Sequence, residues 1–388
     1  MKFASRLVNF EAAPGDPYRP IATPIYQTAT FEQERVDAFG EYDYTRSGNP
    51  TRTVLERQLA SLENGTHAYC FSSGMAAISA VTRLLCSGDE ILADVDLYSG
   101  TSRLFSKVLD RAGIDVRYAD ALDPEGFAQR MTTATKLVHI ESPTNPLFRV
   151  VDIQRITEIA HAHGALFSID NSAMSPYLQN PLDLGADIVI HSGTKFLGGH
   201  HDVTGGVVIV QNETPAQQIR FVYNAEGAAL SPFDSFLLLR GLKTLKLRLD
   251  CQQKNAMAVA KYLSSRKEIT KVYYPGLAES EGYELHRRQA RGPGSVMSFT
   301  TGSVDLSKAI AQSTKLFHMT VSFGSVSSSI GMPGTMSHAS VPPEVLAQRE
   351  LPPDLIRISV GIEDEEDLIA DFDQAIEKAS QQVFNPVD

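Results

Sequence analysis

Asp170 and Lys195 are the residues whose positions most clearly suggest chemistry, because each follows a short apolar run. Leu166 to Ile169 precedes Asp170, and Ala186 to Ile190 precedes the run from His191 to Lys195, which reads HSGTK. Such non-alternating runs are typical of strands buried on both faces of a parallel sheet. Open α/β sheets bind ligands beyond the carboxyl ends of their strands. The pattern therefore predicts one carboxylate and one lysine in the same crevice.

This pair has the chemistry that pyridoxal phosphate (PLP) requires. A lysine amine forms a Schiff base with the aldehyde of PLP, and hydroxyl groups such as those of Ser192 and Thr194 bind the phosphate. A carboxylate such as Asp170, within about 4–6 Å of the ring nitrogen, favours the protonated pyridinium, which is the better electron sink. Taken singly, Asp170 also fits a strand-end turn residue and Lys195 a solvated lysine. Their combination with the two hydroxyls favours the cofactor.

Four further residues fit the same ligand. Gly74 and Met75 open an expected helix after a strand, where free backbone N–H groups bind an anion, although an ordinary capped turn fits equally well. Tyr98 follows the strand that begins at Glu90 and can stack on the pyridine ring and offer its hydroxyl to a leaving group, unless it is a core tyrosine. Asn145, in the loop after Lys136 to Ile140, is placed to bind the phenolate oxygen of PLP.

Several motifs occur in an order that resembles the Cys/Met metabolism PLP enzymes. They lie between about residue 20 and about residue 370 and read YDYTRSGNPTR, FSSGMAA, ESPTNP, DNSAMSP, HSGTKFLGGHHDV, MSHAS and RISVGIEDEEDL. The resemblance implies fold type I, the α/β fold of aspartate aminotransferase, with a central, mostly parallel sheet and a smaller C-terminal α+β domain. We expect an N-terminal arm at 1–46, a PLP-binding domain at 47–236 and a C-terminal domain at 237–388.

The remaining candidate residues gain their roles from this resemblance. Tyr44 and Arg46 lie one strand step apart and can hold a phosphate, and the resemblance implies that they reach the cofactor of a partner subunit. An arginine on a strand, Arg357, is expected to grip the α-carboxylate of the substrate. By the same resemblance, Ser328 is expected near the cofactor lysine, and Arg103 is expected to bind a distal group of the substrate. Taken alone, each arginine also fits a surface position.

Composition limits the possible partners. The chain has 388 residues and a net charge of −11, which argues against nucleic acid and anionic membranes. It has three cysteines without CxxC spacing, no apolar run long enough to span a bilayer and no leader. We expect a cytoplasmic protein without a metal site, although an organelle-targeting peptide removed earlier would leave no trace. The apolar residues of the arm and the family resemblance predict a homotetramer of dimers with shared active sites.

The resemblance leaves the reaction to be chosen. Relatives with γ-chemistry carry glutamate where Ser327 stands, and the SFGSV, MP and MSHAS segments resemble cystathionine β-lyases of the plant type. We therefore expect a carbon–sulfur lyase of methionine biosynthesis that cleaves cystathionine to homocysteine, pyruvate and ammonia. Cystathionine γ-synthase and γ-lyase are the alternatives, and Gly100 argues against a methionine γ-lyase. A scaffold that has lost catalysis is a further alternative, which the retained Asp170 and Lys195 disfavour.

Overall fold

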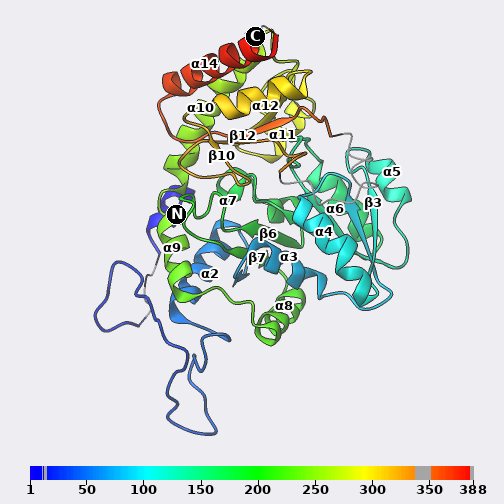
Figure 1. The fold of residues 1–388 in the computed structure, drawn as a ribbon. Coiled ribbons are helices and arrows are strands. Elements are labelled where there is room, and N and C mark those ends of the chain that lie inside the picture. Colours follow the sequence, from blue (N-terminus) through cyan, green and yellow to red (C-terminus); the bar gives the residue numbers. More distant parts are fainter. Residues whose placement is uncertain (11, 13–14, 337–350, 385–388) are drawn as a thin grey trace.

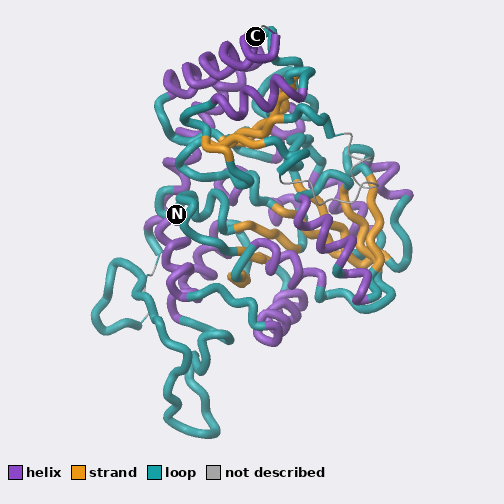
Figure 2. Tube along the Cα trace, in the orientation of Figure 1, coloured by secondary structure: helices purple, strands orange, loops and turns teal. Residues whose placement is uncertain are grey.

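The computed structural model describes all residues except 11, 13–14, 337–350 and 385–388. Its described strands form two sheets (Figures 1 and 2). The larger has seven strands in the order β1-β7-β6-β5-β4-β2-β3. They are β1 (His67–Phe71), β7 (Gly206–Val210), β6 (Ile188–Ser192), β5 (Leu166–Asp170), β4 (Thr135–Glu141), β2 (Glu90–Asp94) and β3 (Asp115–Ala119). The strands β6, β5, β4, β2 and β3 are parallel to one another. Strand β7 pairs antiparallel with β6 on one side and with β1 on the other.

Helices cover both faces of this sheet, which confirms the expected α/β class. Alternate residues of a strand enter different cores: Val207 and Ile209 pack with α2 and α6, whereas Val208 and Val210 pack with α3 and α8. The first face also carries α1, α5, α7, η2 and α9, and the second carries α4 and η1. The bounds are α1 (Phe3–Val8), α2 (Pro50–Leu62), α3 (Gly74–Thr82), α4 (Ser99–Lys107), η1 (Leu109–Ala112), α5 (Pro124–Gln129), α6 (Ile153–Ala162), α7 (Ser175–Leu178), η2 (Pro181–Leu184), α8 (Glu213–Glu226) and α9 (Pro232–Leu242).

The second sheet belongs to the C-terminal part and has five strands among the described residues, in the order β10-β11-β12-β9-β8. Helices α10, α12 and α14 pack against it around a separate apolar core (Figure 1, top). The bounds are α10 (Leu245–Ser265), β8 (Lys271–Tyr273), α11 (Tyr283–Gln289), β9 (Val296–Thr300), α12 (Val304–Ser313), β10 (His318–Met319), β11 (Ser329–Gly331), β12 (Ile356–Ser359) and α14 (Glu365–Phe384). This is the expected smaller α+β unit.

Two helices lie near the expected domain boundary. They are α9 and α10, and the helical structure breaks between them at Lys243 and Thr244. The expected boundary at 236 lies inside α9. Core contacts change only along α10, because Leu249 packs with the large sheet and Ala256 with the small one. The division into three units stays a prediction.

The N-terminal arm has two parts. Its first residues form α1, which was not expected, and Leu7 of this helix is buried against α2. The chain from about 15 to 46 forms long loops that extend away from the body (Figure 2, lower left). Several of its apolar side chains are almost fully exposed, including Tyr18 at 90%, Ile21 at 94% and Val36 at 97%. Such an extended apolar segment suits contact with another subunit.

Candidate active site

The predicted crevice is present. A cavity of about 220 Å³ lies beyond the carboxyl ends of β4, β5 and β6 and is closed on its other side by the C-terminal part of the chain. Its walls bring together Gly74, Met75, Tyr98, Asn145, Asp170, Ser192, Thr194, Lys195 and Arg357 from the predicted set. They are joined by Ser73, Ile78, Glu141, Pro143, Ser172, Ala173, Thr204, Val321 and Phe323.

Lys195 reaches the cavity from the loop after β6, and its amine is held by the C-terminal part. Nζ donates a hydrogen bond to Oγ of Ser322 at 2.7 Å and lies 4.8 Å from the ring centre of Phe323. Burial, and after it the charge of Arg357, lower the pKa of Lys195 to about 8, while the charge of Asp170 opposes this shift. A substantial share of this lysine is therefore neutral near pH 7 to 8, as a nucleophile or base must be.

Asp170 ends β5, one strand away from Lys195. Its Oδ1 accepts a hydrogen bond from the backbone N–H of Ser172 at 2.9 Å. Burial raises the pKa of Asp170, and the hydrogen bonds from Ser172 and the charges of His191 and Lys195 oppose the rise. The ionised form of a buried carboxylate is stabilised by a nearby cation, and a pyridinium N–H would be such a cation.

The opposite wall provides donors for a phosphate. Ser73 caps α3 by accepting from the N–H of Ala76 at 3.1 Å, so the N–H groups of Gly74 and Met75 lack an acceptor within the helix. The two phosphate walls are in contact, because a Cβ added to Gly74 would lie 3.1 Å from Cβ of Ser192. Helix N-termini of this kind bind anions.

Arg357 lies on β12 between the buried side chains of Ile356 and Ile358, as expected. Its Nη1 donates to Oδ1 of Asn145 at 3.0 Å, and its Nη2 donates to the carbonyl of Val321 at 3.1 Å. Burial lowers the pKa of Arg357 to about 10, which leaves the guanidinium charged at neutral pH. The structure thus presents a fixed cation in the cavity, suited to a carboxylate.

Tyr98 stands at the cavity and is 38% exposed, so it is not a core tyrosine. Its backbone N–H donates to Oε1 of Glu141 at 2.6 Å. The ring lies against Gly100, where an added Cβ would come within 2.4 Å of Tyr98 Cε1 and 2.8 Å of Met75 Sδ. Any side chain at residue 100 would therefore displace the Tyr98 ring or Met75.

Four predicted residues do not line this cavity. Ser328 is a correction: its hydroxyl donates to Glu363 and accepts from the N–H of Gly361, and Ser322 takes the place beside the lysine. Glu363 anchors this turn, because its two carboxylate oxygens accept hydrogen bonds from the N–H and the hydroxyl of Ser328. Arg103 lies on α4, away from the cavity wall.

Tyr44 and Arg46 lie in the extended arm, where the guanidinium of Arg46 packs 5.4 Å from the ring centre of Tyr44. Neither lines the cavity of its own chain. Their predicted role at a partner's cofactor stays a prediction. Ser327, which served to separate β- from γ-chemistry, is likewise outside the cavity wall. The MSHAS motif continues past Met336 into residues 337–340, which lie outside the described residues.

Sequence reasoning missed Ser322, Ser172, Glu141 and Phe323. Ser172 and Glu141 had a signal, because Glu141 ends β4 and Ser172 lies two residues after the end of β5. Ser322 and Phe323 had none, since they come from a run rich in serine and glycine whose fold places it over the lysine. Ser172 supports the site from within, because its Oγ accepts from the N–H of Ser192 at 2.6 Å.

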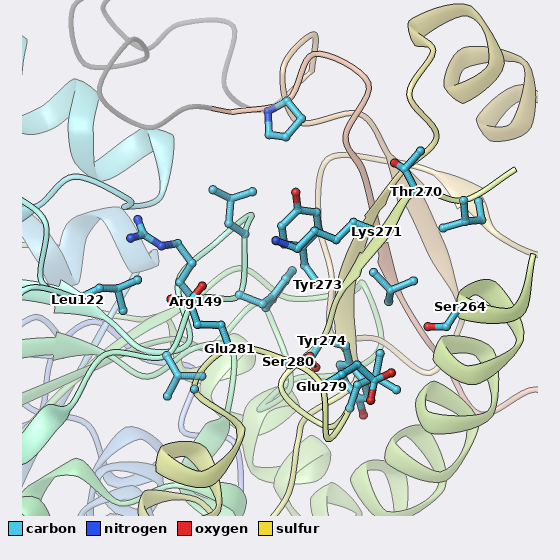
Figure 3. A pocket seen from close by; sticks show the side chains of 18 of the residues that line it. Leu122, Arg149, Ser264, Thr270, Lys271, Tyr273, Tyr274, Glu279, Ser280 and Glu281 are labelled. Carbon is cyan, nitrogen blue, oxygen red and sulfur yellow. Dashed lines mark hydrogen bonds between the residues drawn. The ribbon is translucent and has the colours of Figure 1, made fainter. Parts of the chain in front are cut away.

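A larger cavity of about 940 Å³ lies elsewhere, between the loop at 147–150 and β8 (Figure 3). In Figure 3, Arg149 points toward this space from one side and Lys271 and Tyr273 lie on the other. Arg149 makes an ion pair with Asp120 at 2.8 Å. None of the residues that line the smaller cavity lines this larger one, so it is not the candidate active site.

The described residues contain no group of three or more histidine, cysteine or acidic side chains that could hold a metal ion. Within the same part of the chain, no helix combines the length and apolar character needed to cross a membrane.

The donors around the smaller cavity fit PLP: a lysine of lowered pKa, a buried carboxylate one strand away, and a helix N-terminus facing two hydroxyls. Comparison with known proteins agrees. The family model described as Cys/Met metabolism PLP-dependent enzyme matches residues 4–377. The chain is 53% identical to the chloroplastic cystathionine beta-lyase of Mimosa pudica over 95% of this chain and 81% of that protein.

Two further likenesses bear on the choice of reaction. The chloroplastic mimosinase of Mimosa pudica is 48% identical over 95% of this chain and 84% of its own. The structure of cystathionine gamma synthase from Xanthomonas oryzae in complex with cystathionine superimposes with a TM-score of 0.96 and 38% identity, covering 99% of this chain and 100% of that one. The same framework therefore accompanies more than one named activity.

Proposed function

The chain belongs to the Cys/Met metabolism PLP-dependent enzymes, and from this premise we propose that it is a cystathionine β-lyase. The reaction consumes L-cystathionine and water and releases homocysteine, pyruvate and ammonia. The observation that carries this choice is the identity to a named β-lyase over nearly the whole chain, which clearly exceeds the identity to the γ-synthase of the same fold.

The residues that would hold the cofactor are those of the smaller cavity. Bound there, PLP supplies an aldehyde for an amine and a cationic ring that accepts electrons from Cα of an amino acid. Lys195 would hold the aldehyde carbon, and Asp170 would keep the ring nitrogen protonated. The N–H groups of Gly74 and Met75, with the hydroxyls at 192 and 194, would bind the phosphate.

The substrate would be held by Arg357, whose guanidinium suits the α-carboxylate. When the α-carboxylate is fixed, the Cα–H bond is held in one orientation, which reduces the entropic cost of reaching the transition state. The amine of Lys195, with its pKa near 8, can then accept the proton from Cα. The hydroxyl of Tyr98, at the exposed side of the cavity, is placed to interact with the sulfur that leaves from Cβ.

γ-Cleavage is the alternative, because the structural neighbour named above is a γ-synthase. It requires removal of a second proton, at Cβ, before sulfur leaves from Cγ. The test is to incubate the PLP-loaded protein with L-cystathionine and identify the products by mass spectrometry. Pyruvate with homocysteine supports the proposal, and 2-oxobutanoate with cysteine contradicts it. A parallel assay with O-succinylhomoserine and cysteine tests for synthase activity.

The assembly and cellular role follow from the same proposal. We infer a homotetramer of dimers in which Tyr44 and Arg46 complete the phosphate site of the partner subunit, as their position in the extended arm and the exposed apolar residues there support. Release of homocysteine suits methionine biosynthesis. The cytoplasm is the expected location, and the plant relative named above is chloroplastic, which makes a plastid the alternative.

A further inference from the structure

Glu63 lies at the centre of a buried polar network behind the cofactor cavity. The residue is completely buried at the C-terminal end of α2. Its Oε1 lies 2.5 Å from Nε2 of His191 and accepts from Nδ2 of Asn171 at 2.9 Å, and its Oε2 accepts from Nδ2 of Asn180 at 2.7 Å. A carboxylate is unfavourable at a helix C-terminus, so helix stability does not explain this residue.

The network touches the ends of β4, β5 and β6, which carry three of the predicted cofactor contacts. Asn171 directly follows Asp170, and His191 directly precedes Ser192. Gln179 extends the network, because its Nε2 donates to Oδ1 of Asn171 at 3.0 Å and to the carbonyl of Ser142 at 2.8 Å, three residues before Asn145. Since successive residues of a strand point to opposite faces, the network holds these strand ends from below the cavity.

Glu63 is the one polar anchor that the described residues provide for the imidazole of His191. The ring is 1% exposed, and its other nitrogen, Nδ1, makes no hydrogen bond with any described residue. The charge of His191 in turn acts on Asp170. Without the Glu63 carboxylate, no polar group among the described residues would fix the ring.

We propose that Glu63 is a positioning residue for the cofactor: through His191, Asn171 and Gln179 it fixes the strand ends that place Asp170, Ser192 and Asn145. It touches neither cofactor nor substrate. The inference concerns PLP binding, so it holds whichever carbon–sulfur bond of the substrate is cleaved, and a wrong choice between β- and γ-chemistry would leave it intact.

The test compares Glu63→Gln with Asp371→Asn in the full chain. Asp371 is a matched control, because it is also a buried carboxylate that accepts several hydrogen bonds, from the N–H groups of Lys315 and Leu316, but in the C-terminal core. PLP affinity of each apoprotein is measured by titration, and the visible circular dichroism of bound PLP reports how its ring is held. Thermal unfolding of each apoprotein measures stability separately.

We expect Glu63→Gln to weaken PLP affinity by about tenfold or more, on the scale known for groups that orient the ligands of a metal, and to reduce the circular dichroism signal. Asp371→Asn should lower the unfolding temperature and leave both cofactor readouts at wild-type values. If Glu63→Gln lowers only the unfolding temperature and binds PLP as the wild type does, the proposal is wrong.

A second variant covers the case in which Glu63→Gln does not fold. Gln179→Met removes no charge and keeps a similar volume, and it cuts the hydrogen bonds from the Gln179 amide to Ser142 and Asn171. We expect weaker PLP binding and a changed circular dichroism signal in a folded protein. Wild-type values for both readouts in this variant would overturn the proposal.

Discussion

At the scale of single residues, two serines six positions apart in the chain have different tasks. Ser322 accepts the hydrogen bond of the Lys195 amine, whereas Ser328 binds the carboxylate of Glu363 and the N–H of Gly361. Sequence reasoning chose Ser328 for the lysine. The segment from 321 to 329 contains many serines and no strong periodicity, so only the path of the chain into β11 shows which hydroxyl faces the cavity.

Replacing each serine by alanine should separate these tasks. In Ser322→Ala the lysine amine loses its hydrogen bond to the Ser322 hydroxyl, and we expect kcat to fall about tenfold or more while the free energy of unfolding changes little. Ser328→Ala should instead lower the free energy of unfolding by about 1–3 kcal/mol, because partners are left unsatisfied in a buried place. Steady-state kinetics and urea unfolding measure the two effects. Equal kinetic losses in both variants would contradict this assignment.

Arg357 controls the protonation of Lys195 as well as holding a carboxylate. Its positive charge adds to the effect of burial, and together they lower the pKa of the lysine to about 8. Removing the charge in Arg357→Leu stabilises the protonated amine, so the pKa of Lys195 must rise. PLP uptake by the apoprotein requires the neutral amine. The rate of uptake should therefore increase with pH around a midpoint near 8 in the wild type and around a higher pH in the variant. An unchanged midpoint would show that the two groups are not coupled.

At the scale of elements, the sequence allowed the sheet to be predicted well. The strands β5, β6 and β7 are formed mainly by apolar residues, and polar residues of the cavity follow β5 and β6, so Asp170 and Lys195 could be placed without coordinates. The break between α9 and α10 could not, because Lys243 and Thr244 are ordinary helix residues and packing against two different cores decides where the helix ends. The contact of α1 with α2 likewise depends on tertiary packing.

Helix α2 carries a carboxyl that should make stability depend on pH. Burial raises the pKa of Glu56 to about 7 from an ordinary value of 4.5, although Arg52 and the N–H of Cys70 oppose the rise. Between these two pH values the folded state binds more protons than the unfolded state, so stability falls as pH rises. The contribution of Glu56 to the free energy of unfolding is fully present below about pH 4.5. It is lost as pH rises through 7, and between these values the free energy of unfolding falls by about 1.4 kcal/mol per pH unit.

Glu56→Gln should remove this slope, because a neutral amide mimics the protonated carboxyl. The measurement is the free energy of unfolding in urea at several pH values between about 4.5 and 8. Glu125→Gln is the control, since Glu125 is an exposed helix carboxylate in a surface ion pair with Arg155 and should leave the pH dependence unchanged. A pH dependence of Glu56→Gln equal to that of the wild type would contradict the shifted pKa.

At the scale of the whole molecule, the contacts within one chain do not account for the conformation of the N-terminal arm. Its apolar side chains are exposed, and Tyr44 and Arg46 lie outside the cavity of their own chain. The sequence indicated a neighbouring subunit because these residues are too apolar for a solvated terminus.

Mixing two inactive variants tests for shared sites. Arg46→Ala and Lys195→Ala should each be strongly impaired as pure proteins. When they are unfolded and refolded together in equal amounts, half of the dimers should be mixed, and each mixed dimer should hold one site with both residues intact. About a quarter of the wild-type activity should therefore return. If activity stays at the level of the separate variants, Arg46 serves its own chain or no site at all.

The central claim, β-elimination, is tested most directly with L-cystathionine that carries carbon-13 only in its three-carbon half. The PLP-loaded wild-type protein is incubated with this substrate, and the keto acid is isolated and examined by mass spectrometry. β-Elimination predicts labelled pyruvate and unlabelled homocysteine. Unlabelled 2-oxobutanoate together with labelled cysteine would show that the bond on the other side of sulfur is cleaved, and would contradict the proposed function.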